Sequence, residues 1–187
     1  MAIQTNVTLD AIGLACPMPI VKTKKAMNAM EPGQVLEVLA TDKGSKADLQ
    51  AWAASSGHQY IGIIEEGSVL KHYLRKSNGE EETEKKHPYV ISNEELVEKL
   101  QDSSVIIVDV REAAEYAFTH IPGAVSIPIG DLEKEASSLN KEAEIYVVCR
   151  TGNRSDLAAQ QLAKQGFQHV INVVPGMSQW TGATESL

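Results

Sequence analysis

Alternating apolar and polar positions in the first 76 residues predict four strands and two helices. The helices are expected at 17–30 and 45–56, the second with Ser45 as its N-cap and Gly57 as its stop. The strands are expected at 4–9, 35–40, 60–64 and 69–74, with the last two joined as a hairpin across Glu66-Gly67. The order βαβαββ predicts a two-layer α/β sandwich.

The second half of the chain shows a different pattern, in which short runs are wholly apolar and rich in β-branched residues. Such runs at 105–108 (VIIV) and 145–148 predict strands buried on both faces, as a parallel sheet with helices on either side requires. A further strand is expected at 170–174, and helices at 93–101, capped by Asn93, and at 156–165. This pattern predicts a doubly wound parallel sheet, in which chemistry lies just beyond the carboxyl ends of the strands.

Residues 77–87 separate the two patterns and contain no large apolar side chain. This segment, SNGEEETEKKH, carries charges of both signs and cannot bury enough surface to offset its ordering entropy. It therefore predicts a linker between domains at 1–76 and 88–187, although a surface loop within one domain would read similarly. Charge supports two domains, because residues 1–76 have a formal charge of +1 whereas the remainder has −9, which together give the net charge of −8.

Composition excludes several classes of protein. The negative net charge argues against direct nucleic-acid binding. No apolar run approaches the roughly 18 residues of a membrane span, and the first residues lack the basic and apolar regions of a secretory signal. Two cysteines far apart predict free thiols rather than a disulfide framework, so we expect a cytoplasmic protein.

The segment CRTGNRS, residues 149–155, follows a buried strand and precedes a helix. Its glycine permits a positive φ, so the loop amides and the helix start form an anion cradle that favours a nucleophilic thiolate. The predicted nucleophile is Cys149, and the predicted substrate-binding residues are Arg150, Thr151, Gly152, Asn153 and Arg154. A buried structural cysteine is one alternative, and a phosphatase is another. The phosphatase pattern is Cys-x5-Arg, however, and the Cys-x4-Arg spacing here favours a smaller cargo, a sulfur atom held as a persulfide.

The other cysteine, Cys16, precedes Pro17, and proline favours the first position of a helix. We therefore expect Cys16 at the N-cap, where the helix dipole would lower the pKa of its thiol. Lysines 22, 24 and 25 would add a basic rim. The alternative is a lone cysteine that fills a gap at a helix start. No metal site is expected, because no ligand-like spacing surrounds it.

Residues 88–187 resemble a rhodanese (sulfurtransferase) domain. The resemblance rests on VDVREAAEY (108–116), HIPGAVSIP (120–128), CRTGNRS (149–155) and PGMSQW (175–180). It implies a doubly wound parallel sheet, an active-site loop from Cys149 to Arg154, and a persulfide on Cys149. It also implies that Asp109, Arg111 and His120 support the scaffold rather than perform chemistry.

Residues 7–76 resemble the TusA-type (SirA-like) sulfur carriers. The matching stretches are LDAIGLACPMPIVKTKKAM (9–27), PGQVLEVLATD (32–42) and the hairpin that ends in YLRK (73–76). The resemblance implies that Cys16 carries a persulfide and passes it to partner proteins, for which a DsrE-like protein or a cysteine desulfurase would be a suitable donor or acceptor.

Both halves thus point to persulfide chemistry. The hypothesis is a sulfurtransferase in which Cys149 takes a sulfane sulfur from thiosulfate, a polysulfide or a low-molecular-weight persulfide, and relays it through Cys16 to an acceptor. The reverse direction is chemically allowed. No cofactor is expected, because the sulfur is carried covalently on cysteine. The alternative is a docking or redox- and persulfide-sensing module that serves the carrier half without turnover.

Overall fold

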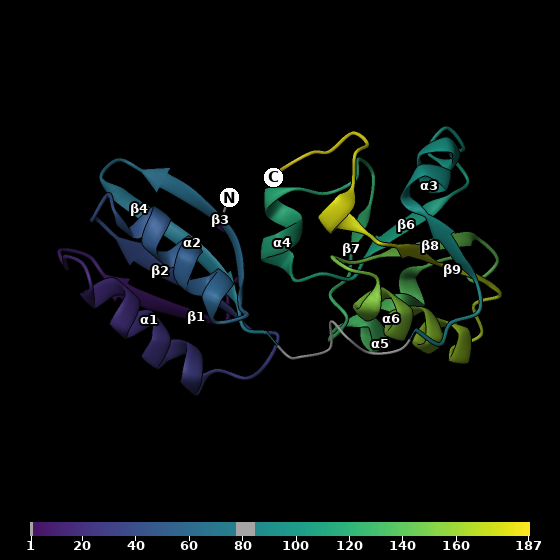
Figure 1. Ribbon diagram of the computed structural model, residues 1–187. Helices are drawn as coiled ribbons and strands as arrows, with labels where there is room; N and C mark the ends of the chain where they lie inside the picture. Colours follow the sequence, from purple (N-terminus) through teal and green to yellow (C-terminus); the bar gives the residue numbers. More distant parts are fainter. Residues whose placement is uncertain (1, 78–84) are drawn as a thin grey trace. The chain divides into compact units, whose positions relative to one another are not determined.

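The computed structural model describes residues 2–77 and 85–187, which belong to two compact units of residues 1–79 and 80–187 (Figure 1). The predicted linker at 77–87 lies largely outside the described residues. Its last residues, 85–87, are described, and the backbone N–H groups of Lys86 and His87 donate hydrogen bonds to Asp156 of the second unit.

The first unit is a four-stranded mixed sheet covered on one face by two helices, as Figure 1 shows. Its strand order is β1-β2-β4-β3, with β1 and β2 parallel and the other neighbours antiparallel. The elements are β1 (Val7–Ala11), α1 (Met18–Ala29), β2 (Val35–Ala40), α2 (Ser45–Ser55), β3 (Gln59–Glu66) and β4 (Val69–Arg75). This is the predicted βαβαββ order, with the first strand shifted by a few residues toward the C-terminus.

The core of this unit lies between the central strand β2 and the two helices. Leu36 and Val38 of β2 are fully buried, and they pack in one cluster with Met27 of α1 and Leu49 of α2. Because β1 and β2 are parallel, the loops that follow them meet at the same edge of the sheet. The β1–α1 loop carries Cys16, and the β2–α2 loop leads into the helix that carries Asp48.

Ser45 does not cap α2 as predicted. Gly44 is the N-cap, and Ser45 lies in the first turn of the helix with a buried side chain. Its hydroxyl lies 2.9 Å from Nε2 of His72, and the hydroxyl of Tyr60 lies 2.8 Å from Nδ1 of the same ring. His72 is fully buried, so these two hydroxyls satisfy both ring nitrogens of a neutral imidazole.

Acid is expected to destabilise the first unit through His72. Burial, with a smaller contribution from Lys46, lowers the pKa of His72 to about 4. In the unfolded chain the His72 imidazole is therefore protonated near pH 6.5, whereas in the folded unit it stays neutral down to about pH 4. Between these values falling pH removes up to about 3 kcal/mol of stability.

The measurement is urea unfolding at several pH values, followed by Trp52 fluorescence in a Trp180→Phe protein. His72→Gln serves as the control: it should lower stability at neutral pH and flatten the pH slope. An unchanged slope in His72→Gln would show that other groups carry the acid sensitivity.

The second unit is a five-stranded parallel sheet in the order β5-β9-β8-β6-β7. Its strands are β5 (Val90–Ser92), β6 (Ile106–Asp109), β7 (Val125–Ser126), β8 (Glu144–Val148) and β9 (His169–Val174). Its helices are α3 (Asn93–Lys99), α4 (Ala113–Phe118), α5 (Leu132–Glu135), η2 (Ala136–Ser138), α6 (Asn153–Lys164) and η3 (Met177–Gln179). Figure 1 shows α3 on one side of the sheet and α5 and α6 on the other. The predicted fold class is therefore confirmed.

The central strand β8 is buried on both faces because each face has its own core. Ile145 and Val147 pack in a cluster with Leu162 of α6, whereas Tyr146 and Val148 pack in a second cluster with Leu96 of α3. The strand therefore holds its carboxyl end, and the loop that follows it, between two rigid layers.

The predicted N-cap of α3 is wrong by one residue. Ser92 caps the helix, because its hydroxyl accepts from the N–H of Glu95 and the Glu95 carboxylate accepts from the N–H of Ser92. Asn93 is instead buried, and its side-chain amide both donates to and accepts from the backbone of Gly176. This pair of hydrogen bonds fixes the segment after β9, which lies against the Cys149 loop.

Candidate functional site

Cys149 lies directly after β8, at the start of the loop that leads into α6. Gly152 is the N-cap of α6 with a φ of +89°, the left-handed conformation predicted for this glycine. Its backbone N–H donates to Cys149 Sγ at 3.1 Å, and the hydroxyl of Ser155 lies 3.3 Å from the same sulfur. The helix begins earlier than predicted, so Asn153, Arg154 and Ser155 all lie in its first turn, and the sulfur faces the positive end of the helix dipole.

Arg154 closes the loop through an ion pair that the sequence did not reveal. Its two guanidinium nitrogens donate to the two carboxylate oxygens of Glu115 in α4, at 2.7 and 3.0 Å, and both residues are buried. Burial alone would disfavour the charged guanidinium, but Glu115 and, to a smaller extent, Cys149 raise the pKa of Arg154 above its ordinary value. Arg154 is thus a fixed positive charge that holds the loop in shape and lies close enough to Cys149 to influence it.

The backbone after β9 supports the other side of the loop. The N–H of Met177 donates to the carbonyl of Cys149 at 2.8 Å, and that of Ser178 donates to the carbonyl of Arg150 at 2.9 Å. Gly176 adopts a φ of +90°, and a Cβ there would collide with the Cys149 carbonyl oxygen. The side chain of Asn172, in β9, donates to the carbonyl of Gly152. These contacts fix the loop amides in position before any donor arrives.

The resemblance implied a scaffold role for Asp109, Arg111 and His120, and the contacts of Arg111 and His120 agree with it. The Arg111 guanidinium donates to both carboxylate oxygens of Asp109 and to the carbonyl of Thr119. His120 stacks on Tyr116 with a ring-centroid distance of 3.8 Å, and its Nδ1 lies 2.8 Å from the Tyr116 carbonyl.

Cys16 occupies a more open site in the first unit. It lies in the β1–α1 loop and is exposed, whereas Cys149 is fully buried; both thiols are free, as predicted. Cys16 is not the N-cap of α1, because the helix begins at Met18 with Pro17 as the N-cap. The N–H of Met18 is already bonded to the carbonyl of Ala15. The thiol therefore lies outside the helix start, where the dipole has less effect on it.

The prediction that the pKa of Cys16 would be lowered is wrong. A hydrogen bond with the Asp48 carboxylate is the largest cause of a raised pKa, and the negative charges of Asp48 and Asp42 add to it. Both carboxylates lie beside Gly44, at 3.4 and 3.7 Å from the position that a Cβ would take there. The N–H of Gly13 donates to the Thr41 hydroxyl at 2.9 Å, which holds the Cys16 loop against this acidic loop. Lysines 22, 24 and 25 are exposed on α1.

Replacing Asp48 by asparagine is expected to shift the pH profile of Cys16 alkylation to lower pH. Removing the carboxylate lowers the pKa of the thiol, so a larger fraction is thiolate at pH 7 and iodoacetamide reacts several-fold faster. The rates are measured in a Cys149→Ser protein, which leaves one cysteine. Glu65→Gln, a charge change at an exposed position in β3, is the matched control. Identical profiles for the two variants would show that Asp48 does not set the proton affinity of Cys16.

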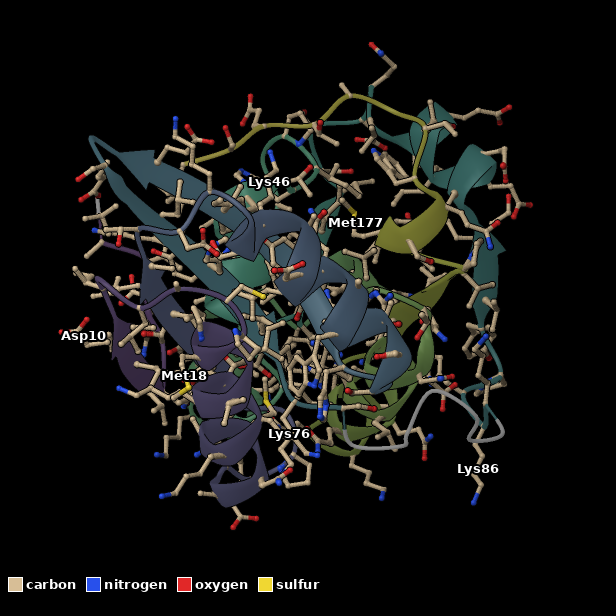
Figure 2. All side chains as sticks on the ribbon, turned by 60° about the vertical axis from the view of Figure 1, so that its left-hand side comes forward. Asp10, Met18, Lys46, Lys76, Lys86 and Met177 are labelled. Carbon is tan, nitrogen blue, oxygen red and sulfur yellow. The ribbon has the colours of Figure 1, made fainter. Side chains whose placement is uncertain are left out.

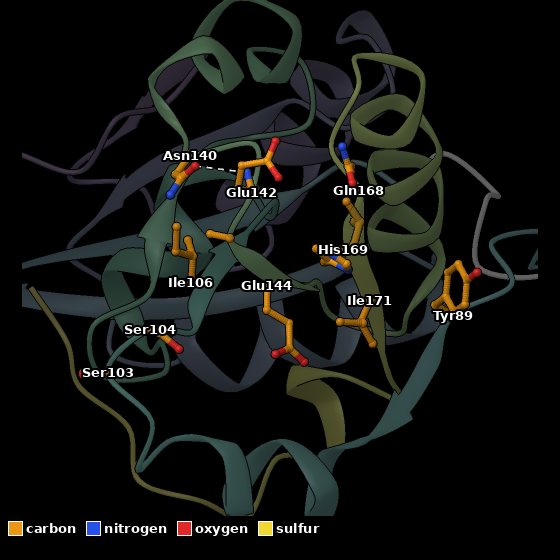
Figure 3. Close-up of a pocket in the computed structure, with 12 residues that line it drawn as sticks. Tyr89, Ser103, Ser104, Ile106, Asn140, Glu142, Glu144, Gln168, His169 and Ile171 are labelled. Atoms are coloured by element: carbon orange, nitrogen blue, oxygen red, sulfur yellow. Dashed lines mark hydrogen bonds between the residues drawn. The ribbon is translucent and has the colours of Figure 1, made fainter.

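A surface cleft of about 1040 Å³ lies at the other end of the second sheet (Figure 3). It is lined by residues such as Ile106, Glu144 and His169, which stand at the amino ends of β6, β8 and β9. Cys149 follows the carboxyl end of β8, so this cleft is separate from the thiol.

Residues 2–77 and 85–187 contain no group of three or more histidine, cysteine, aspartate or glutamate side chains that could hold a metal ion. Within the same residues no helix is both long enough and apolar enough to cross a bilayer.

Comparison with known proteins matches each unit to one family. The profile of the family "Sulfurtransferase TusA" matches residues 7–76, and that of the family "Rhodanese-like domain" matches residues 92–183. "Putative sulfur carrier protein YrkF" of Bacillus subtilis is 54% identical over 184 residues, which cover 97% of this chain and 99% of that protein. The chain therefore belongs to the TusA and rhodanese-like families.

Other relatives match one domain each. "Sulfur carrier protein TusA" of Allochromatium vinosum is 48% identical over 69 residues, which cover 37% of this chain and 91% of that protein. A crystal structure of a rhodanese-like domain protein from Staphylococcus aureus matches with a TM-score of 0.50 and 36% identity, covering 53% of this chain and 98% of that chain. The TusA domain thus holds Cys16, and the rhodanese-like domain holds Cys149.

Several residues of the rhodanese-like site lay beyond prediction. Glu115 comes from α4 and Asn172 from β9, and nothing in the sequence near either of them indicated a contact with the Cys149 loop. Ser155 ends the CRTGNRS segment, and no role at the sulfur was predicted for its hydroxyl. Its position in the first turn of α6, which begins at Asn153 after the N-cap Gly152, is the signal that could have placed the hydroxyl beside Cys149 Sγ.

Proposed function

We propose that this sulfurtransferase loads a sulfane sulfur onto Cys149 and relays it to Cys16 for delivery to an acceptor. The observation that carries the proposal is the hydrogen bond of 3.1 Å from the Gly152 amide to Cys149 Sγ. The ends of this loop are held by the ion pair of Arg154 with Glu115 and by the hydrogen bond from the Met177 N–H to the Cys149 carbonyl. Such a loop stabilises negative charge on sulfur, both on the free thiolate and on the terminal atom of a persulfide.

The loading step with thiosulfate as donor is a displacement at sulfur. The Cys149 thiolate attacks the outer sulfur of thiosulfate, the S–S bond of thiosulfate breaks, and sulfite leaves with the electron pair. The product is a Cys149 persulfide whose terminal sulfur carries the negative charge. A polysulfide or a low-molecular-weight persulfide would react in the same way, with a shorter polysulfide or a thiolate as the leaving group.

The relay step repeats this chemistry with Cys16 as the nucleophile. The Cys16 thiolate attacks the terminal sulfur, the bond between that sulfur and Cys149 Sγ breaks, and Cys149 leaves as a thiolate. Cys16 must lose its proton before it attacks, and because Asp48 raises the pKa of this thiol, the step is expected to become faster as the pH rises. No external oxidant or reductant is needed, because each S–S bond broken is replaced by another.

The environments of the two sulfurs favour transfer from Cys149 to Cys16. Exchange is faster when the leaving sulfur is stabilised as a thiolate, and the Gly152 amide and the nearby Arg154 charge provide this at Cys149. The carboxylates of Asp48 and Asp42 raise the pKa of the Cys16 thiol, so its sulfur is a basic nucleophile and a poor leaving group.

The exposure of Cys16 fits a carrier that delivers sulfur to a protein. Cys16 and Cys149 belong to one chain, which would give the two thiols a high effective concentration if their sites can face each other. Met18 and Val21, close to Cys16 in sequence, are exposed apolar side chains, and Figure 2 shows Met18 on the outer surface. A protein acceptor or donor, such as a DsrE-like protein or a cysteine desulfurase, would suit this open site. No dissociable cofactor takes part in either step.

A docking or persulfide-sensing module without turnover is the second candidate. The buried position of Cys149, fully shielded from solvent, is the observation in its favour. Turnover separates the two candidates: the intact protein, given thiosulfate and cyanide, is expected to form thiocyanate and to leave p-nitrophenyl phosphate unhydrolysed. Absence of turnover with thiosulfate, polysulfide and glutathione persulfide, with Cys149 unmodified throughout, would leave only the docking role.

A further inference from the structure

Lys85 lies at the edge of the Cys149 loop, although its position in the charged segment predicted a linker residue. The two residues that follow it are anchored: the N–H groups of Lys86 and His87 donate to the Asp156 carboxylate at 2.9 to 3.1 Å. Nε2 of His87 lies 2.7 Å from the carbonyl of Val170, and both Asp156 and His87 are buried. Since Asp156 belongs to the first turns of α6, the backbone at Lys85 is fixed to the helix that closes the loop.

The Lys85 side chain extends over Gly152. A Cβ built on Gly152 would lie 3.1 Å from Lys85 Cε, 3.3 Å from Lys85 Nζ and 2.7 Å from Val174 Cγ1. The amide of this same glycine donates to Cys149 Sγ. The ammonium group therefore lies within a few ångströms of the backbone that contacts the sulfur, while remaining exposed to solvent. Lys86 is different, because Figure 2 shows its side chain pointing away from the protein.

A cation at this position changes the charge that an incoming donor meets. The Arg154 guanidinium is held by both oxygens of Glu115, which offsets much of its charge toward other anions. A donor such as thiosulfate carries two negative charges, which its outer sulfur and its oxygens share, and that outer sulfur must approach a thiolate. A nearby ammonium with access to solvent would offset that repulsion without the cost of burying a charge.

We propose that Lys85 is an anion-binding residue of the Cys149 site, and that it favours donors with negative charge next to the sulfane sulfur. The proposal rests on the proposed function for the identity of the donor. The site itself depends only on the contacts of Lys85, Gly152 and Asp156, and it makes the start of the rhodanese-like domain part of the donor site.

The test measures binding of thiosulfate to the full-length Cys149→Ser protein, in which no sulfur can be transferred. Isothermal titration at low ionic strength is expected to show binding that weakens about three- to tenfold in Lys85→Gln, as the loss of one charge at this range predicts. Lys86→Gln, the matched control, is expected to bind as tightly as the parent. In protein with Cys149 intact, Lys85→Gln should raise the KM for thiosulfate by a similar factor and change kcat less than twofold.

Each outcome decides between the two proposals. Equal affinities for Lys85→Gln and Lys86→Gln, or no thiosulfate binding to the parent, would overturn the role of Lys85. Lys85-dependent binding of thiosulfate without any sulfur transfer would instead support the anion site and contradict the proposed function.

Discussion

Replacing Cys149 by serine is expected to lower the rate of thiocyanate formation from thiosulfate by at least about 10³-fold. A serine hydroxyl is not ionised at neutral pH and cannot form the persulfide. Serine is close in size to cysteine, and it retains hydrogen-bonding partners in the Gly152 amide and the Ser155 hydroxyl, so the loop should stay folded. The measurement is a steady-state assay beside a thermal-unfolding curve of each protein.

Cys16→Ser is the matched control for this variant. It also removes one thiol, yet the proposed mechanism requires only Cys149 for transfer to cyanide, so its rate should stay within about twofold of the parent. Turnover that survives in Cys149→Ser and disappears in Cys16→Ser would assign the loading step to the TusA domain instead.

Replacing Glu115 by glutamine is expected to lower the free energy of unfolding of the rhodanese-like domain by about 3 to 5 kcal/mol. Glutamine is nearly isosteric and can still accept from the N–H of Glu112, but it leaves the Arg154 charge buried without its carboxylate partner. The loss is measured by urea unfolding, followed through Trp180 fluorescence in a Trp52→Phe protein.

Two further variants show whether the buried charge is the cause. Glu133→Gln, which changes an exposed carboxylate in α5, should cost less than about 0.5 kcal/mol. Adding Arg154→Met to Glu115→Gln removes the stranded charge and should recover part of the loss. A loss in Glu115→Gln no larger than that in Glu133→Gln would show that the ion pair does not stabilise the domain.

The fold was largely predictable because local patterns and tertiary structure agree in both domains. The β-branched run at 105–108 and the apolar strand before Cys149 needed only their own composition to be identified as strands of a parallel sheet. The errors concern residues whose side chains can either cap a helix or form a hydrogen bond with a distant part of the chain. Ser45 and Asn93 are good N-caps by type, yet each hydrogen-bonds to a partner distant in sequence, at His72 and Gly176 respectively.

The site was predictable as a loop but not as a charge distribution. The motif from Cys149 to Arg154 was enough to locate the nucleophile and the loop amides, because all of them belong to one short stretch of sequence that ends in the first turn of α6. The partners of that motif, Glu115 and Lys85, come from other elements, and only the folded chain brings them to the loop. The same limit explains Cys16: the helix dipole is a local effect, and the carboxylate of Asp48, on the next helix, outweighs it.

Mass spectrometry of the protein after incubation with thiosulfate, on the intact chain and on its peptides, tests the relay most directly. The wild type, Cys16→Ser and Cys149→Ser are loaded, digested and compared for an adduct of about 32 Da, one sulfur atom, on each cysteine. The relay predicts that Cys149 is loaded in Cys16→Ser and that Cys16 is loaded in the wild type but not in Cys149→Ser. A Cys16 adduct of undiminished abundance in Cys149→Ser would contradict it.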